Sequence, residues 1–144
     1  MNPQTKINIT SLLRDNGFKV TPQRLAICDV LVNTCDHPSA EMIYERLRYN
    51  YPTMSLATVY KTIGILKELS LIQVLNIGED SLRCDADTSI HLHVRCAHCS
   101  KVEDVHGIES EKFIEEVIAH SNYKLCGQQF YFFGICPECQ KRDL

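Results

Sequence analysis

The sequence of 144 residues contains no apolar run that approaches the ~20 residues needed to cross a bilayer, so we expect no membrane span. Its first residues, MNPQTKINITSLLRDNG, have neither the apolar core nor the small-residue cleavage site of a signal peptide, and we therefore expect a cytoplasmic protein. A strong excess of positive charge is also missing, since the formal net charge is −3. This balance argues against a nonspecific polycation, but it permits specific DNA binding through a local patch.

Charge, histidine and cysteine are unevenly distributed along the chain. Residues 1–82 carry eight Lys/Arg and eight Asp/Glu, whereas residues 83–144 carry seven Lys/Arg and ten Asp/Glu. Five of the six histidines and six of the eight cysteines also lie after residue 83. Acids, imidazoles and thiols are the side chains that bind cations. We therefore predict two small domains, residues 1–84 and residues 85–144, of which the second binds metal.

Half of the cysteines form two C-x2-C pairs, Cys96 with Cys99 and Cys136 with Cys139, and 36 residues separate the pairs. Each short loop directs two thiolates at one centre, so the two pairs together predict a closed, tetrahedral four-cysteine zinc site. The alternative is two unrelated knuckles or redox-active dithiols. The remaining cysteines have no such spacing, and we expect them to be small buried hydrophobic side chains: Cys28, Cys35, Cys84 and Cys126.

The first half of the chain has the pattern of a winged helix-turn-helix. Apolar residues at three- and four-residue steps, with caps and prolines at the ends, predict helices over 5–16, from Thr21-Pro22 to Asn33, from Pro38-Ser39 to before Pro52, and from Ser55. Residues 71–75 and 81–84 then read as two strands around a turn at 78–80. Three helices followed by a hairpin are typical of a winged helix. We predict an α+β protein in which this domain precedes a small α/β dimerisation domain.

The helix that begins at Ser55 is the candidate DNA-reading helix. Its apolar stripe must pack inward and consists of Leu56, Val59, Ile63 and Leu66. The opposite face then presents groups that suit base edges and phosphates: Ser55, Thr58, Lys61 and Thr62, with Tyr60 at the border. Lys19 and Arg24 flank the start of the helix at Thr21 and are expected to hold the DNA backbone. The alternative is the solvated face of an ordinary helical domain.

In the second half, residues 90–95 alternate in polarity as a strand does, and residues 101–105 form a second strand after the first cysteine pair. If the connecting loop centres near His98, side-chain parity places four groups on one face: His91, His93, Asp104 and His106. Two imidazoles and a carboxylate suit a borderline divalent ion such as Fe, Mn or Zn. The alternative is a set of structural histidines.

The rest of the second half contains an amphipathic helix over 109–120 and an apolar segment within 123–135. The run Phe130-Tyr131-Phe132-Phe133 is apolar on both faces, which predicts a strand that is central in its sheet or lies in an interface. A half of about 60 residues makes only a marginal core. We therefore expect zinc and a partner subunit to supplement it.

Four motifs, in order along nearly the whole chain, resemble the ferric-uptake-regulator (Fur) family of bacterial metal-dependent repressors. They are Thr21-Pro22-Gln23-Arg24, the run from Met54 to Lys61 (MSLATVYK), the run from His91 to Cys99 (HLHVRCAHC), and Cys136-Pro137-Glu138-Cys139. The sequence is most similar to the peroxide-sensing (PerR) branch, in which an aspartate stands where iron-uptake sensors tend to have glutamate. Here that acid is Asp104.

The resemblance implies a homodimer that binds double-stranded operator DNA, with one structural Zn²⁺ and one regulatory Fe²⁺ or Mn²⁺ per subunit. It assigns the zinc to Cys96, Cys99, Cys136 and Cys139, and the regulatory ion to His37, Asp85, His91, His93 and Asp104. His37 and His91 match the positions that are oxidised in the branch. Two positions depart from the family pattern. At Lys61 the peroxide-sensing branch often has Asn and the iron regulators have Arg. Near Cys126 many relatives have a histidine that belongs to a further metal site. We expect no third site of that kind.

These features predict a non-enzymatic transcriptional repressor that senses peroxide through iron-catalysed oxidation of a histidine ligand. One alternative is an iron- or manganese-uptake regulator of the same fold that senses metal only. Another is a zinc hydrolase with His91, His93 and Asp104 around an open-position metal. The hydrolase would need a placed general base or nucleophile, which the sequence does not indicate, and would leave the winged-helix pattern unexplained.

Overall fold

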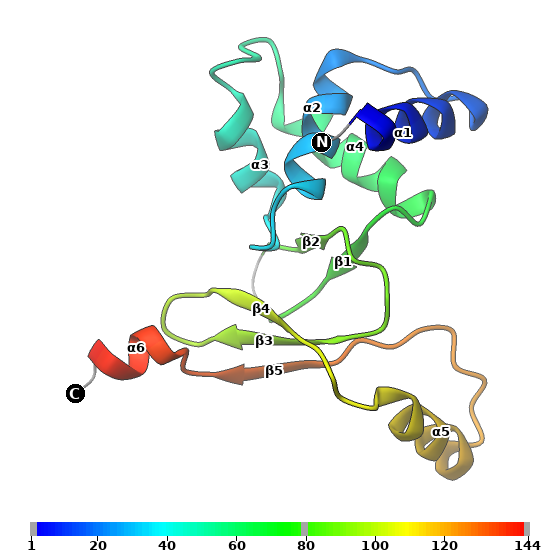
Figure 1. Ribbon diagram of the computed structural model, residues 1–144, viewed down its shortest axis with the longest axis vertical. Coiled ribbons are helices and arrows are strands. Elements are labelled where there is room, and N and C mark those ends of the chain that lie inside the picture. Colours follow the sequence, from blue (N-terminus) through cyan, green and yellow to red (C-terminus); the bar gives the residue numbers. More distant parts are fainter. Residues whose placement is uncertain (1–2, 79–80, 143–144) are drawn as a thin grey trace. The chain divides into compact units, whose positions relative to one another are not determined.

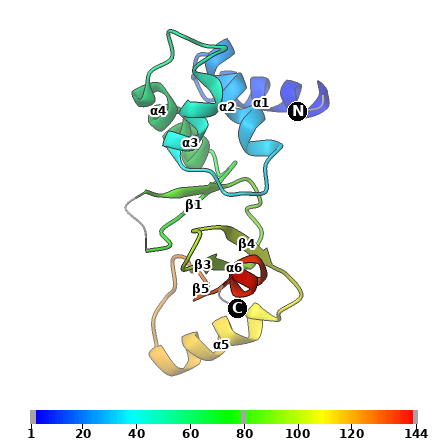
Figure 2. The same ribbon diagram turned by 90° about the vertical axis from the view of Figure 1, so that its left-hand side faces the viewer.

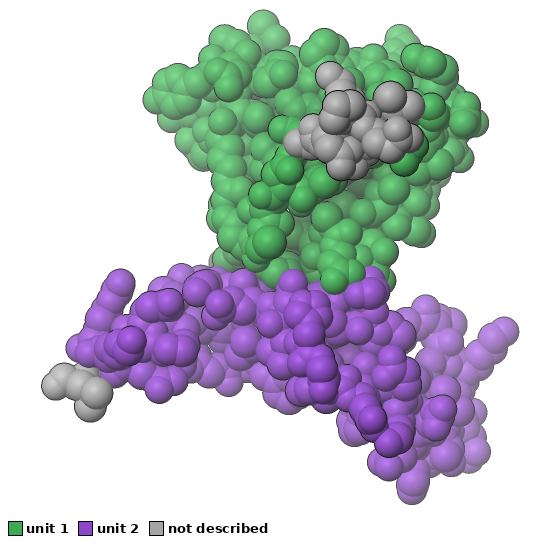
Figure 3. Space-filling view, in the orientation of Figure 1, with its two compact units in different colours: residues 1–88 green, residues 89–144 purple. Residues whose placement is uncertain are grey.

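The computed structural model describes residues 3–78 and 81–142. It divides the chain into two compact units, residues 1–88 and residues 89–144 (Figure 3). Both helices and strands are present in each unit, so the predicted α+β class is confirmed.

Unit 1 is a winged helix, as predicted. Its helices are α1 (Pro3–Asp15), α2 (Pro22–Val32), α3 (Ala40–Leu47) and α4 (Leu56–Glu68), and they are followed by the strands β1 (Gln73–Leu75) and β2 (Arg83–Asp85). The strands pair antiparallel and form the wing, with Val74 opposite Cys84. In Figure 2 the four helices gather on one side of this hairpin. Two residues of the predicted turn, Glu79 and Asp80, lie outside the described residues.

Side-chain caps begin three of these helices. The hydroxyl oxygens of Thr21, Ser39 and Ser55 each accept a hydrogen bond from the backbone N–H three residues later, at 3.2 Å in every case. Such a cap satisfies an N–H that has no partner within the helix. Helix α3 ends at Leu47, earlier than predicted, because the N–H groups of Asn50 and Tyr51 close a turn on the Leu47 carbonyl before Pro52 is reached.

The core of unit 1 lies between its helices. Leu13, Ile27 and Ile43 are fully buried, and Val59 anchors the inner face of α4 against them. Thr62 also points inward, which corrects its predicted place on the DNA-facing side. It is only 1% exposed and donates to the Thr58 carbonyl at 2.8 Å, so its hydroxyl is satisfied within the helix.

Over its described residues, 89–142, unit 2 contains a three-stranded sheet and two helices. Its elements are β3 (Leu92–Cys96), β4 (Val102–Val105), α5 (Ser110–Ser121), β5 (Tyr131–Gly134) and α6 (Pro137–Arg142). The strand order is β4-β3-β5, with β3 antiparallel to β4 and parallel to β5. Figure 1 shows α6, which the sequence analysis did not predict, following the carboxyl end of β5.

The apolar segment that forms β5 is an edge strand among the described residues, so of its two predicted positions the central one is excluded and the interface remains. Phe132 and Phe133 are each 55% exposed, and Phe113 on α5 is equally exposed. Within the described part of unit 2, the buried cluster around the C-terminal strand and helix consists of Cys96, Cys136 and Cys139. This unit therefore presents large apolar side chains on its surface, while three thiols form a buried cluster and Leu92 and Val102 are buried as well.

Candidate metal centres and DNA-facing surface

The two cysteine pairs meet in unit 2. Cys96 ends β3, Cys99 lies in the turn before β4, Cys136 precedes α6, and Cys139 lies on α6. Their four sulfur atoms all lie within 4.8 Å of one another. The turn is joined to the end of β5, just before α6, by a hydrogen bond from the Ala97 N–H to the Gly134 carbonyl at 2.8 Å.

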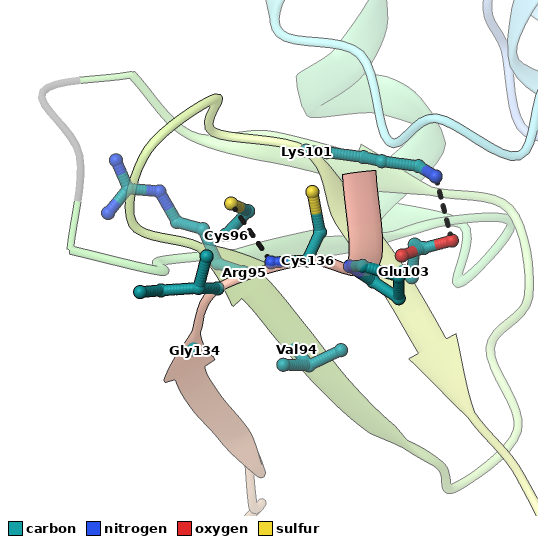
Figure 4. A pocket seen from close by; sticks show the side chains of 9 residues that line it. Val94, Arg95, Cys96, Lys101, Glu103, Gly134 and Cys136 are labelled. Carbon is teal, nitrogen blue, oxygen red and sulfur yellow. Dashed lines mark hydrogen bonds and ion pairs between the residues drawn. The ribbon is translucent and has the colours of Figure 1, made fainter. Parts of the chain in front are cut away.

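This geometry fits a tetrahedral metal ion. A zinc ion with Zn–S bonds of ~2.3 Å requires sulfur atoms roughly 3.8 Å apart, and the Sγ atoms of Cys99 and Cys136 are 3.7 Å apart. The backbone N–H of Cys136 donates to Cys96 Sγ at 3.3 Å and lowers the pKa of the Cys96 thiol to about 6. Figure 4 shows these two cysteines at the edge of a pocket that also holds the Lys101–Glu103 ion pair. The centre therefore has the donors and the spacing of a four-cysteine zinc site. The lowered pKa belongs to Cys96, whereas the hydrogen bond from Cys136 raises the pKa of the Cys139 thiol.

The second set of donors in unit 2 lies on the hairpin of β3 and β4. His93 pairs directly with Asp104, which is the register that side-chain parity predicted. Asp104 Oδ1 lies 3.2 Å from His91 Nε2 and 3.4 Å from His93 Nε2. The Nδ1 atom of His91 lies 3.0 Å from the Ser89 carbonyl. A proton on that Nδ1 leaves Nε2 with the lone pair that a metal ion requires.

Unit 1 contributes a separate pair, His37 and Asp85, with Nε2 and Oδ2 3.6 Å apart. His37 has a φ of 50°, an uncommon conformation for a residue other than glycine, and Arg83 Nη1 donates to its carbonyl at 3.1 Å. Asp85 accepts hydrogen bonds from Gln73 Nε2 at 3.1 Å and from the Asp87 N–H at 2.8 Å. Strand β2 thus supplies the candidate ligand Asp85, and its Arg83 holds the backbone of the other candidate, His37.

The sequence analysis missed Gln73 and Arg83 as residues that position candidate ligands. Arg83 reaches a carbonyl 46 residues earlier in the chain, and Gln73 reaches Asp85 across the wing. No local pattern marks such residues, because their role depends on which strands pair. The one signal in the sequence was a charged side chain, Arg83, inside a predicted strand, where it would need a hydrogen-bond acceptor.

The predicted DNA-facing residues all lie on unit 1. Ser55, Tyr60 and Lys61 are exposed, as is Lys19, whereas Arg24 and Thr58 are half-buried. Four of the six line one surface pocket, namely Lys19, Arg24, Thr58 and Lys61, together with Thr21, Pro22, Gln23 and Tyr51.

Two contacts hold this surface in shape. Arg24 donates to the Lys19 carbonyl, and the Tyr60 hydroxyl donates to the carboxylate of Glu41 on α3. Because the Tyr60 hydroxyl donates to the carboxylate, this contact lowers the pKa of Glu41 from its ordinary value and raises the pKa of Tyr60 from its own. The sequence analysis gave Glu41 no role, and its contact with α4 is seen only in the structure.

A winged-helix unit followed by a unit with a four-cysteine centre defines a class: metal-binding transcription regulators. The model of the ferric uptake regulator family matches residues 15–133, and the chain belongs to this family. It is 43% identical over 135 residues to the transcriptional regulator PerR of Clostridium acetobutylicum, covering 94% of this chain and 98% of that protein. It is 37% identical over 134 residues to the peroxide operon regulator of Bacillus subtilis, covering 91% and 90% of the two chains.

Among solved structures, the ferric uptake regulator Fur of Helicobacter pylori matches with a TM-score of 0.80 and 26% identity. That match covers 97% of this chain and 95% of the other. The resemblance proposed from the motifs, to the family and to its peroxide-sensing branch, is confirmed. In the described residues, 3–78 and 81–142, no helix has both the length and the apolar character that crossing a bilayer requires.

The four cysteines outside the candidate zinc centre fall into two groups. Cys28 and Cys84 are buried, as predicted, but Cys35 and Cys126 are exposed, so the prediction was wrong for the latter two. Burial raises the pKa of the Cys28 and Cys84 thiols to about 11. A protonated, buried thiol is a poor nucleophile, whereas an exposed one reacts.

We predict that iodoacetamide at pH 8 alkylates Cys35 and Cys126 in the folded protein and spares Cys28 and Cys84, as read by peptide mass spectrometry. Denatured protein provides the control, because all four should then react. Since the folded pKa of the buried thiols lies above the unfolded value, the unfolding free energy should also fall as the pH rises from about 9 towards 11. Equal labelling of the four folded thiols would contradict the burial.

Proposed function

We propose that the protein is a metal-dependent, DNA-binding transcriptional repressor of the cytoplasm that senses peroxide. Its similarity, over most of the chain, to regulators named for peroxide carries this proposal. The structure supports it with a winged helix in unit 1 and with metal-ligating side chains in both units. In the proposed division of labour, residues 1–84 bind DNA and residues 85–144 bind metal and dimerise.

The proposed regulatory ion, Fe²⁺ or Mn²⁺, takes ligands from both units. Unit 1 offers His37 and Asp85, and unit 2 offers His91, His93 and Asp104. Nitrogen and carboxylate donors of this kind suit both ions. Because each unit supplies only part of the five ligands, an ion that binds all five side chains favours an arrangement in which the units are held together. A nearly complete switch between two arrangements needs a difference of about 5.5 kcal/mol in binding free energy, which the loss of two ligands could supply.

The proposed structural ion is zinc, one per subunit, at Cys96, Cys99, Cys136 and Cys139. Four thiolates without an open position are typical of structural rather than catalytic zinc. The ion would cross-link the β3–β4 turn to α6, where the sulfur atoms already meet. Its binding free energy would contribute directly to the folding of this small unit.

The proposed DNA-binding surface is the outer side of α4 with the start of α2. It comprises Lys19, Arg24, Ser55, Thr58, Tyr60 and Lys61. Lysine and arginine at this surface suit phosphates, and the hydroxyl groups suit base edges. Glu41 accepts the Tyr60 hydroxyl proton in a hydrogen bond, so it fixes the direction of that ring on the surface.

A homodimer is proposed because unit 2 leaves apolar side chains exposed on an edge strand. More than half of the surface of three phenylalanines stays exposed in the single chain. They are Phe132 and Phe133 on the edge strand β5 and Phe113 on α5. An edge strand also offers unpaired backbone groups to a second strand. Two subunits joined here would present two reading helices to a pseudo-palindromic operator, with half-sites one DNA turn, roughly 34 Å, apart.

The proposed response to peroxide is the oxidation of a ligand, His37 or His91. Iron, when bound, supplies the redox chemistry with peroxide. In the net change an imidazole carbon exchanges its bond to hydrogen for a bond to oxygen, and the ring loses two electrons. Hydrogen peroxide accepts these electrons as its O–O bond breaks: one oxygen atom balances the one that the ring gains, as C–OH, and the other leaves as water. The oxidised ring is a poorer ligand, so the ion and then the operator are released.

A second candidate is an iron- or manganese-uptake regulator that senses metal alone. The fold matches a Fur protein with a TM-score of 0.80, and Lys61 differs from the residues frequent at that position in either branch. Membership in a family of regulators favours both candidates over a hydrolase. Retained DNA binding after peroxide treatment of the iron-loaded protein would identify the metal-only regulator.

We predict that Cys96→Ser abolishes stoichiometric zinc and lowers the unfolding free energy by several kcal/mol, because the cross-link between the turn and α6 is lost. Zinc content by atomic spectroscopy, thermal unfolding and sedimentation measure the effect. Cys126→Ser, an exposed thiol of the same unit, is the matched control and should leave all three unchanged. A folded, dimeric Cys96→Ser protein without zinc would refute the structural role.

For DNA binding, we predict that the metal-free protein binds its operator weakly and that Mn²⁺ or Fe²⁺ restores tight binding by a dimer. Lys61→Ala should weaken this binding. If Lys61 contacts phosphate alone, the salt dependence should decrease by about one charge per subunit. Lys67→Ala, which removes an exposed lysine from the last turn of the same helix, is the control. Equal affinity of metal-free and metal-loaded protein in fluorescence anisotropy would refute metal dependence.

For peroxide sensing, we predict that dilute peroxide adds one oxygen atom to the iron-loaded protein and none to the manganese-loaded protein. Peptide mapping should place the oxygen on His37 or His91, with the four zinc cysteines still open to alkylation after denaturation. Asp104→Glu should retain metal-dependent DNA binding and reduce this oxidation, since the longer acid changes how the iron faces solvent. Oxidised cysteines with zinc release and intact histidines would instead indicate a thiol switch.

A further inference from the structure

Unit 2 holds a further imidazole beside the candidate regulatory ligands. His106 follows β4 and places its Nε2 atom 3.9 Å from Asp104 Oδ2. Its ring centre lies 5.3 Å from that of His91, and the two rings are inclined by 31°. Side-chain parity in the sequence had already placed His106 on this face, but the ligands implied by the family resemblance do not include it.

The carboxylate of Asp104 separates the three histidines into two groups. Its Oδ1 atom faces His91 and His93, at 3.2 and 3.4 Å, whereas its Oδ2 atom faces His106. The ring centres of His91 and His93 are 4.4 Å apart, and both Nε2 atoms lie near the same oxygen atom of Asp104. Three imidazoles around one carboxylate are a donor set for a borderline divalent cation such as Mn²⁺, Fe²⁺, Co²⁺ or Zn²⁺.

The exposure of these side chains distinguishes their roles. The side chains of His91 and His93 are 2% and 4% exposed, while that of His106 is 63% exposed. An exposed side chain changes rotamer without disturbing a core, so His106 has room to approach an ion or to leave it. Since all four residues belong to residues 89–144, their geometry is a property of one compact unit.

We infer that His91, His93, Asp104 and His106 form a four-donor site that holds a divalent cation within unit 2, without a ligand from unit 1. The inference rests on the proposed regulatory ion and adds a second coordination state for it. When His37 and Asp85 do not bind, His106 supplies the fourth donor. When they bind, His106 gives up its place. The two arrangements of the units then differ in their ligands while the ion remains on the protein.

The test uses the full chain, with zinc loaded at the cysteine centre, and removes the unit 1 ligands by the double substitution His37→Ala, Asp85→Ala. Equilibrium dialysis measures Co²⁺ affinity and stoichiometry, and the visible absorption of Co²⁺ reports its coordination. We expect the double variant to bind one Co²⁺ per chain without a thiolate charge-transfer band. Adding His106→Ala should weaken that binding by at least ~10-fold, because one of four donors is lost.

His120→Ala in the same double variant is the matched control. His120 is an exposed histidine of α5 whose Nδ1 atom lies 2.8 Å from the Glu116 carbonyl, and its removal should change nothing. In the otherwise unchanged chain, His106→Ala should leave affinity nearly unaltered, since five ligands remain. If the double variant fails to fold, Asp85→Ala with and without His106→Ala makes the same comparison.

Two results would overturn the inference: a folded double variant that binds no Co²⁺, or one whose Co²⁺ affinity is the same with and without His106. Either result leaves the proposed function intact if the unsubstituted protein still binds its operator only with metal. Conversely, an unsubstituted protein that binds the operator without metal would refute the proposed function. The Co²⁺ comparison would then stand as a measurement of this site alone.

Discussion

The pairing of β3 with β4 is the constraint on which both candidate metal centres depend. It sets His93 opposite Asp104, and the same hairpin ends in the turn that carries Cys96 and Cys99. A slip of one residue in this register would turn every side chain of one strand to the other face. Asp104 would then leave His91 and His93, and Cys96 would turn away from Cys136. A single register therefore positions one oxygen- and nitrogen-rich site and one sulfur-rich site.

In unit 1 a comparable role belongs to the wing. Strand β2 carries Asp85, and its Arg83 side chain and Cys84 N–H bind the carbonyls of His37 and Pro38, at 3.1 and 3.0 Å. Ser39, which follows directly, caps α3 and forms a bridge with Arg83. The loop that carries His37 is thus held by the wing on one side and continues into α3 on the other.

From α3, the contacts continue to the candidate DNA-facing surface. Glu41, in the first turn of that helix, accepts the hydrogen bond from Tyr60 on α4. Within unit 1, then, the candidate metal ligands and the candidate reading helix are linked by a short series of packed and hydrogen-bonded groups. Under the proposed function, an ion bound at His37 would act on a segment that is already tied to the DNA-facing helix.

The sequence by itself determined the helices of unit 1 and α5, the caps of three of them, and the cysteine centre, because these depend on local spacing, whereas α6 was not predicted. Thr21, Ser39 and Ser55 act as caps through hydrogen bonds to residues three positions away. The spacing of the C-x2-C pairs was by itself enough to indicate that their sulfur atoms share one centre. Strand parity likewise predicted the partner of His93, since alternation and loop length set the register. The family followed from motifs for the same reason.

Only the tertiary structure decided which strand lies at the edge of the sheet, where the exposed thiols are, and which residues orient the candidate ligands. The apolar run of β5 suits a central strand or an interface equally well, and only the pairing order shows it at an edge. Thr62 and Cys35 could not be placed from periodicity, since the faces of a helix and the surroundings of a loop depend on what packs against them. Arg83 and Gln73 bind groups that lie far away in the sequence and come close only when the chain folds, so the sequence alone does not reveal these contacts.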